Sequence, residues 1–322
     1  MKKFFALILA AAFAVLTLAG CASTAKTEDA AIRIAGLKGP TSIGMVKLME
    51  DNESGKSENK YEFTLAGSAD EVTPKLIKGE LDIAAVPANL ASVLYNNTEG
   101  KVQLLAVNTL GVIYIVQRGD GVKTAADLKG KTIYGSGKGS TPEYCLRYIL
   151  EKNGIDPDGD VNIEWKSEHT EVVQALAADE DAIGLLPQPF VTVAQGQAEG
   201  LNIALDLTKE WEAIDADSEM ITGVLAVRKD FAESHKNELD KFLKEYAASV
   251  DYVNSNVSDA AQLVEKYGII KAAVAEKAIP YCNIVCITGD AMIDPMKGYL
   301  KILFEAEPKS IGGELPGEDF YY

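Results

Sequence analysis

A four-residue pattern with the chemistry of an anion site occurs twice, one hundred residues apart. Lys38-Gly39-Pro40-Thr41 and Lys138-Gly139-Ser140-Thr141 share lysine, glycine and threonine at matching positions. Glycine lets the backbone approach a ligand, hydroxyl groups donate hydrogen bonds, and lysine adds positive charge. Each copy also precedes a predicted helix, whose free N–H groups and dipole favour an anion. The pattern therefore predicts a ligand site that includes Lys38, Thr41, Ser42, Lys138, Ser140 and Thr141.

The same residues also fit a purely structural role. Ser140-Thr141-Pro142-Glu143 is an N-cap followed by proline in the first turn and a capping-box glutamate. A cap and a ligand site are compatible, so both interpretations stay open. The segment Gly135–Ser140 is not a nucleotide phosphate loop, because Lys138 is followed by glycine where that motif requires serine or threonine.

Three further polar residues follow predicted strands and are candidates for the same site: Ser68, Asn89 and Gln188. Asn89 could instead cap the next helix. His169 also follows a strand, but a lone histidine there is more often a surface residue. The four arginines lie outside these turns, which disfavours a site that clamps an α-carboxylate with a bidentate guanidinium group.

The elements that would position these residues repeat as well. With an offset of one hundred residues, seven identities fall between residues 68 and 93, where chance would give roughly one or two. The identical positions are Glu71/Glu171, Val72/Val172, Leu76/Leu176, Glu80/Glu180, Ile83/Ile183, Pro87/Pro187 and Val93/Val193. This register without gaps predicts two similar lobes.

Each lobe shows alternating short apolar runs and segments with helical spacing, which predicts an α/β fold with mostly parallel sheets covered by helices. Two longer apolar runs, Val102–Gln117 and Met220–Arg228, are expected to cross between the lobes. Lobe 1 is expected to comprise residues 31–110 and 229–322, and lobe 2 residues 111–228 with both hinge strands.

The N-terminus has the features of an export signal. Lys2 and Lys3 precede an uncharged apolar stretch that ends in Leu18-Ala19-Gly20-Cys21. This pattern predicts a signal peptide over residues 1–20, a flexible tether over residues 21–30 and a lipid on Cys21. An uncleaved membrane helix is the alternative, but the run is at the lower limit for spanning a bilayer.

Charge and cysteine content exclude several classes. The 322-residue chain has 31 basic and 48 acidic residues, a net charge of −17, which disfavours nucleic acid and an electrostatic membrane anchor. Apart from Cys21, three cysteines remain, an odd number that disfavours a disulfide framework. With two histidines in the chain, a zinc site is not expected, and no other cofactor is indicated.

Four segments together resemble the solute-binding lipoproteins of ABC importers, in the group related to nitrate, aliphatic-sulfonate and thiamine-pyrimidine binding proteins. They are Leu18–Cys21, Ala126–Ile133 (Ala-Asp-Leu-Lys-Gly-Lys-Thr-Ile), Gly139–Glu143 and Gly184–Phe190 (Gly-Leu-Leu-Pro-Gln-Pro-Phe). The resemblance implies a two-lobed type II periplasmic-binding-protein clamp that closes around a hinge. It also places Thr41, Ser42, Asn89, Ser140, Thr141 and Gln188 at the ligand.

The resemblance implies a monomer outside the cytoplasm, anchored to the bacterial cell membrane by Cys21. It would deliver a small organic solute, anionic or rich in acceptors and sulfonate- or pyrimidine-like, to a permease driven by an ATPase. It would not be an enzyme. Two alternatives stay open: an enzyme on the same fold, disfavoured because no nucleophile–base pair is evident, and a sensory lipoprotein that uses the clamp for signalling.

Overall fold

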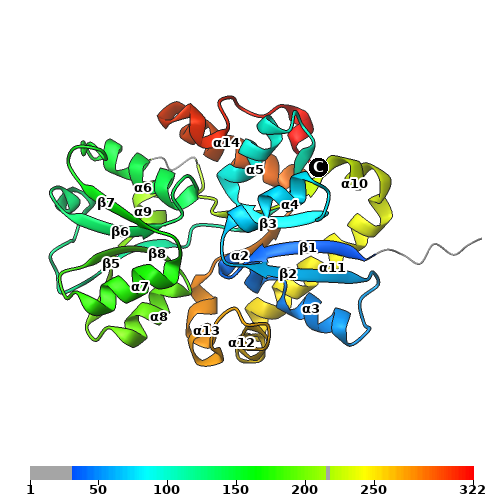
Figure 1. Ribbon diagram of the computed structural model, residues 1–322, viewed down its shortest axis with the longest axis horizontal. Helices are drawn as coiled ribbons and strands as arrows, with labels where there is room; N and C mark the ends of the chain where they lie inside the picture. The colour runs from blue at the N-terminus through cyan, green and yellow to red at the C-terminus, as the bar shows by residue number, and fades with distance from the viewer. Residues whose placement is uncertain (1–30, 215–217) are drawn as a thin grey trace, which may run out of the picture. The chain divides into compact units, whose positions relative to one another are not determined.

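Two β-sheets with helices on both faces form the part of the chain that the computed structural model describes, residues 31–214 and 218–322 (Figure 1). Ile32–Tyr322 packs as one unit. The signal peptide, the tether and the lipid site at Cys21, which were all predicted within residues 1–30, lie outside the described residues. The α/β fold with two mostly parallel sheets is the one predicted from the alternating sequence pattern.

The six-stranded sheet has the order β11-β4-β10-β3-β1-β2. β1, β2 and β3 pair in parallel, and β10 runs antiparallel to its neighbours β3 and β4. The strands are β1 (Ile32–Leu37), β2 (Tyr61–Ala66), β3 (Ile83–Pro87), β4 (Val102–Thr109), β10 (Gly223–Arg228) and β11 (Ile284–Ile287).

The five-stranded sheet has the order β7-β6-β8-β5-β9. β6 pairs in parallel with β7 and β8, and β5 runs antiparallel to β8 and β9. The strands are β5 (Ile113–Arg118), β6 (Thr132–Ser136), β7 (Asn162–Lys166), β8 (Ile183–Pro187) and β9 (Leu201–Asp206).

The two sheets share one plan. Leaving β11 aside, β2-β1-β3-β10-β4 matches β7-β6-β8-β5-β9, with the fourth strand antiparallel in both. β3 and β8 start at Ile83 and Ile183, and β1 and β6 at Ile32 and Thr132. The offset of one hundred residues in the sequence therefore corresponds to equivalent strands in space.

The crossings between the sheets differ in detail from the sequence-based expectation. The chain leaves the six-stranded sheet after β4 and enters the other sheet with β5 through residues 110–112, and it returns from β9 to β10 by way of α9 (Leu207–Ile214). The segment Met220–Arg228 was expected in lobe 2, but β10 within it belongs to the six-stranded sheet. A buried apolar strand has the same sequence signature in either sheet, so the sequence does not indicate which sheet β10 joins. The division of the chain into lobes stays a prediction.

Helices cover both faces of each sheet. One apolar core runs along the same side of both sheets, and two separate cores fill their opposite sides. The shared core lies under α4 (Thr73–Ile77), α5 (Ala88–Asn97), α6 (Thr141–Lys152), α9 (Leu207–Ile214) and α14 (Asp290–Ala306). The opposite side of the six-stranded sheet is covered by α2 (Pro40–Ile43), α3 (Val46–Glu53), α11 (Lys236–Ser255), α12 (Val257–Lys266) and α13 (Ala272–Ala278). The opposite side of the five-stranded sheet is covered by α7 (His169–Ala178) and α8 (Phe190–Gln197). A further helix, α10 (Lys229–Ser234), follows β10 directly.

Helix α14 joins elements that belong to different sheets. The ring of Tyr299 lies 5.7 Å from that of Trp211 in α9, which lies 4.7 Å from that of Tyr148 in α6. The chain then continues into the 3₁₀ turn Pro308–Ile311, which packs on α5 beside the six-stranded sheet. The C-terminal segment therefore contacts helices of both sheets (Figure 1).

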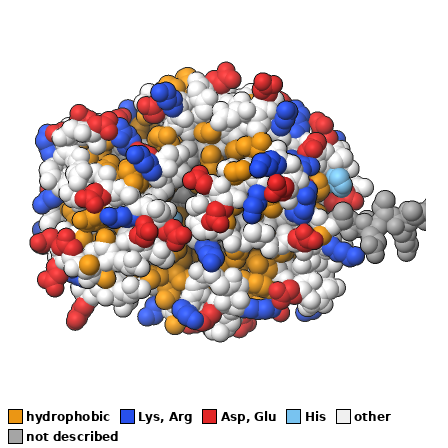
Figure 2. Space-filling view, viewed as in Figure 1, with side chains coloured by type: hydrophobic (Ala, Val, Ile, Leu, Met, Phe, Trp, Pro, Cys, Tyr) orange, Lys and Arg blue, Asp and Glu red, His pale blue; other side chains and the backbone are white. Residues whose placement is uncertain are grey.

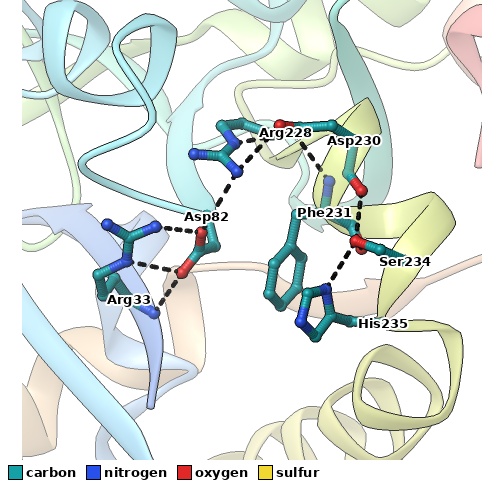
Figure 3. Close-up of polar contacts among 7 residues, drawn as sticks. All are labelled: Arg33, Asp82, Arg228, Asp230, Phe231, Ser234 and His235. Atoms are coloured by element: carbon teal, nitrogen blue, oxygen red, sulfur yellow. Dashed lines mark hydrogen bonds and ion pairs between the residues drawn. The ribbon is translucent and has the colours of Figure 1, made fainter. Parts of the chain in front are cut away.

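A buried carboxylate connects three strands of the six-stranded sheet at the place where β1 and β3 begin and β10 ends (Figure 3). Asp82, 3% exposed, accepts hydrogen bonds from the backbone N–H and Nε of Arg33, both at 2.9 Å, and from Arg33 Nη2 at 2.6 Å. Arg228 at the end of β10 lies 3.9 Å from Asp82 and donates from Nε to Asp230 at 2.9 Å. These bonds compensate the burial of the Asp82 charge and hold the ends of β1, β3 and β10 in register.

Candidate functional site

A cleft of about 490 Å³ lies where the carboxyl ends of strands from both sheets meet. In open α/β sheets this is the edge at which ligands bind. Polar and charged side chains from both sheets line it, as do the glycines of the Lys-Gly-x-Thr turns. The lining side chains that bear on binding are Lys38, Thr41, Ser68, Asp70, Ser136, Lys138, Ser140, Lys166, Glu168 and His169.

The turn after β1 brings a free hydroxyl to the cleft. Thr41 is 8% exposed, and its Oγ1 has no hydrogen-bond partner in the described part of the chain. Asn108 Nδ2 donates to the Thr41 carbonyl at 3.1 Å, which holds the turn in place. A Cβ on Gly223 would approach the Thr41 methyl group to 2.6 Å, so glycine is required there for this packing. A buried unpaired hydroxyl costs free energy unless a ligand or water satisfies it.

The equivalent turn after β6 is closed by its own residues. Ser140 donates from Oγ to the Gly137 carbonyl at 2.7 Å, and Glu143 accepts from the Gly139 N–H at 2.6 Å. Ser140 is the N-cap residue of α6 and Pro142 lies in its first turn, as the capping interpretation predicts. The predicted capping box is not formed, because the Ser140 hydroxyl donates to Gly137 and Glu143 bonds the N–H of Gly139. Lys138 is exposed and projects from the same turn.

A hydrogen-bonded pair, Ser136 and His169, lines the second sheet's side of the cleft. Ser136 Oγ and His169 Nδ1 share a hydrogen bond, and the imidazole packs 4.8 Å from the ring of Phe190. Burial lowers the pKa of His169 to about 4, because the charged form would lose its hydration. The ring is therefore neutral at pH 7. With Nδ1 engaged, Nε2 is the nitrogen available to a ligand. His169 is half-buried in the cleft wall, and whether it contacts a ligand stays a prediction.

Four of the residues predicted for the site do not line the cleft. Ser42 and Asn89 are 0% exposed, Thr141 is 1% exposed and Gln188 is 3% exposed. Gln188 accepts from the backbone and hydroxyl of Thr192 at 3.3 and 2.9 Å, which is a contact at the start of α8. Asn89 and Thr141 bond to each other at 3.2 Å. Their roles in binding stay predictions, and the structure places them behind the cleft wall.

Charge around the cleft is mixed. Lys38, Lys138 and Lys166 line it together with Asp70 and Glu168. Lys166 lies 4.9 Å from the centre of the Tyr134 ring and 3.5 Å from Glu164, so it is partly engaged already. Acidic and basic groups also alternate over the face shown in Figure 2. Attraction for an anion must therefore come from local donors and not from the field of the whole protein.

A second hollow, of about 660 Å³, lies at the opposite edge of the six-stranded sheet. Lys78, Lys101 and Arg228 line it, and so do the carboxylates Asp230 and Glu233. It lies beside the C-terminal ends of α4 and α5, where helix dipoles disfavour anions, and only one sheet contributes to it. The cleft between the sheets is the better candidate because two facing sets of donors meet there.

Metal and membrane features were also sought in residues 31–214 and 218–322. Within this range no group of three histidine, cysteine, aspartate or glutamate side chains could hold a metal ion. Cys145, Cys282 and Cys286 are free thiols. None of the helices in the same range combines the length and apolar character needed to cross a bilayer.

Solved structures share the fold of two sheets described above. Similar folds are found in an ABC transporter protein from Parabacteroides distasonis (TM-score 0.75, 24% identity, 91% of this chain and 99% of that one). The aliphatic sulphonate binding protein SsuA from Escherichia coli has a similar fold, with a TM-score of 0.70 and 17% identity over 89% of this chain and 94% of that one. The alkanesulfonate-binding protein SsuA from Xanthomonas axonopodis has a TM-score of 0.70 and 15% identity over 87% of this chain and 94% of that one. No curated protein matches the sequence.

Residues 52–278 match the family described as ABC transporter, phosphonate, periplasmic substrate-binding protein, and the chain belongs to that family. It is thus a substrate-binding protein of an ABC importer and not an enzyme. Such proteins bind small solutes outside the cytoplasm and deliver them to a permease. The resemblance identified from the sequence is confirmed at this level.

Proposed function

We propose that this chain captures a small organic oxoanion, with a phosphonate- or sulfonate-type headgroup, in the cleft between its two sheets and delivers it to the permease. The observation that carries the proposal is the buried, unpartnered hydroxyl of Thr41 at the cleft. The hydroxyl of Ser68 and the imidazole of His169 line the same cleft, as does Ser140, whose hydroxyl would have to release the Gly137 carbonyl before it could donate to a ligand. Neutral donors converging from two sheets can bind an oxoanion without a large desolvation cost.

Binding strength is consistent with this donor set. Each hydrogen bond to a charged group contributes about 1.5–3 kcal/mol, so three or four give the roughly 8 kcal/mol of a micromolar complex. Lys38 and Lys138 add charge from opposite sides, and Asp70 and Glu168 oppose it. The family description names phosphonate, and two structural relatives are named for sulfonates, which supports the headgroup class.

The anchoring of the protein belongs to the same proposal. Leu18-Ala19-Gly20-Cys21 is followed by a short polar segment that leads to β1 at Ile32. A lipid on Cys21 would keep a monomeric binding protein beside its permease in the membrane. The hinge closure and the lobe boundaries rest on the sheet plan and on the short connection at residues 110–112.

The decisive experiment is mass spectrometry of small molecules released from protein purified in native buffer. Calorimetric titration with methylphosphonate, ethanesulfonate and an uncharged analogue of each then measures affinity. The proposal predicts micromolar or tighter binding of at least one anion and no binding of its uncharged analogue. Release of a cationic solute, or equal affinity for the uncharged analogue, would contradict it.

A further inference from the structure

A buried amide, Asn89, stands where segments from distant parts of the chain converge. It lies in the first turn of α5 and is 0% exposed. Its Nδ2 donates to the Ser310 carbonyl at 2.8 Å and to the Gly139 carbonyl at 3.4 Å. Its Oδ1 accepts from Thr141 Oγ1 at 3.2 Å. Both ends of the amide are therefore occupied by protein groups, and a direct bond to a ligand would have to displace one of them.

The partners of Asn89 come from the other sheet and from the C-terminal segment. Gly139 and Thr141 belong to the turn between β6 and α6, and Ser310 follows α14. Thr141 Oγ1 also accepts from Tyr299 OH of α14 at 3.2 Å. Asn89, on a helix that packs against the six-stranded sheet, thus bonds to the turn Gly137–Thr141 of the five-stranded sheet and to Ser310 in the C-terminal segment.

The turn that Asn89 holds contains two glycines. Gly137 and Gly139 adopt φ values of 84° and 75°, which glycine reaches freely. The contacts of Ser140 and Glu143 close the turn internally but do not fix it against the other sheet. The bonds from Asn89 to Gly139 and Thr141 do so, and the same turn lines the cleft from Gly137 to Ser140.

We propose that Asn89 is a positioning residue for ligand binding: it holds the turn Gly137–Thr141 against the six-stranded sheet and sets affinity without touching the ligand. This inference rests on the proposed function of the cleft. An amide suits the task because the site needs two donors and one acceptor at once. Aspartate would supply no donor, and leucine would leave the hydroxyl of Thr141 and two carbonyl groups without this partner.

The test uses two variants that remove the hydrogen bonds between Asn89 and the turn Gly137–Thr141, and two matched controls that keep them. Asn89→Ala removes the amide, and Thr141→Val removes only the hydroxyl at nearly constant shape. Thr141→Ser keeps the hydroxyl. Asn96→Ala lies on the same helix and removes bonds to Ile311 and Glu314 of the same tail, at 2.9 and 2.7 Å, but has no bond to the turn. If Asn89→Ala does not fold, Thr141→Val decides.

Two readouts separate this inference from the function on which it rests. Hydrogen–deuterium exchange of the peptide covering residues 137–141, without ligand, should rise about tenfold in Asn89→Ala and Thr141→Val and stay unchanged in both controls. The affinity for methylphosphonate or ethanesulfonate should fall about tenfold in the same two variants, mainly through faster dissociation.

Each outcome decides one question. Unchanged exchange and unchanged affinity in a folded Asn89→Ala or Thr141→Val protein would overturn the positioning role. An equal effect of Asn96→Ala would overturn it too, because loss of the tail alone would then explain the result. If the wild-type protein binds neither anion, the proposed ligand class has failed, and the exchange measurement still decides the role of Asn89.

Discussion

Glu71 and Glu171, one hundred residues apart, close the same turn in the two sheets. Glu71 Oε1 accepts from the backbone N–H of Gly67 at 2.9 Å and of Ser68 at 3.2 Å. Glu171 Oε2 accepts from the N–H of Ser167 at 2.8 Å. Both turns border the cleft. The repeated glutamate therefore keeps backbone donors satisfied at matching places on the cleft rim.

Replacing either glutamate by alanine should lower the free energy of unfolding by about 0.5–2 kcal/mol, the usual cost of losing a side-chain cap. Glutamine keeps an acceptor oxygen and should lose less than half as much. Urea unfolding of the four variants measures the effect. Alanine variants as stable as the wild type would show that these contacts contribute nothing.

Thr41→Val should weaken binding of the anion about tenfold while leaving the ligand-free protein as stable as before, or slightly more stable. The hydroxyl has no partner without ligand, so its loss removes a desolvation cost in that state and a hydrogen bond in the complex. Calorimetric titration and thermal unfolding of the same preparations provide the two numbers. Thr41→Ser is the control and should bind normally; a stability loss without an affinity loss in Thr41→Val would contradict a ligand contact.

The stability of the ligand-free protein should fall on acidification because of His169. The unfolded chain binds a proton at this residue near pH 6.5, whereas the folded chain resists protonation until about pH 4. The unfolded state therefore holds more protons between these values, and the free energy of unfolding drops as pH is lowered through that window. Relative to pH 7.5, the loss at pH 5 should be on the order of 1–2 kcal/mol.

The comparison with His169→Gln isolates this contribution, since the carboxylates titrate alike in both proteins. Unfolding free energies measured from pH 7.5 to pH 4 should converge or cross as the wild type loses stability faster. Parallel curves would show that the imidazole titrates normally in the folded protein.

Cys21→Ala should release the protein from membranes into the soluble fraction, because the lipid would have no attachment point. Fractionation followed by immunoblotting measures the distribution, and labelling with a fatty-acid analogue shows whether the wild type carries the lipid. Cys286→Ala serves as the control and should stay in the membrane fraction. Retention of Cys21→Ala in membranes would favour the uncleaved helix.

The alternation of strands and helices and the repeat could be predicted from the sequence because they depend on local patterns. Apolar runs and the repeated positions mark β3 and β8, Ile83–Pro87 and Ile183–Pro187, at matching places. The partners of a strand depend on the whole fold, so the sequence did not reveal that β10 inserts between β3 and β4. Of the residues in the two predicted anion-binding turns, four line the cleft: Lys38, Thr41, Lys138 and Ser140.

Asn89 and His169 show the limit of sequence reasoning for the site. Both follow a predicted strand, and the sequence suggested an amide that faces the cleft or caps a helix, and a histidine at the surface. The structure buries Asn89 completely among Gly139, Thr141 and Ser310, and half-buries His169 against Ser136 and Phe190. These neighbours lie far away in the chain, and no local pattern records them.

The position of β10 determines the order in which the sheets can form as the chain becomes available. All five strands of the second sheet lie between Ile113 and Asp206, so it can be completed from one continuous stretch. The first sheet cannot: until β10 arrives, β3 and β4 face each other across a gap with unpaired, apolar edges. Such edges are open to wrong pairing with other chains. A chain emerging from a membrane export channel could thus complete the second sheet while the first still lacks β10. At that stage the unpaired edges of β3 and β4 would most need the protection of a chaperone.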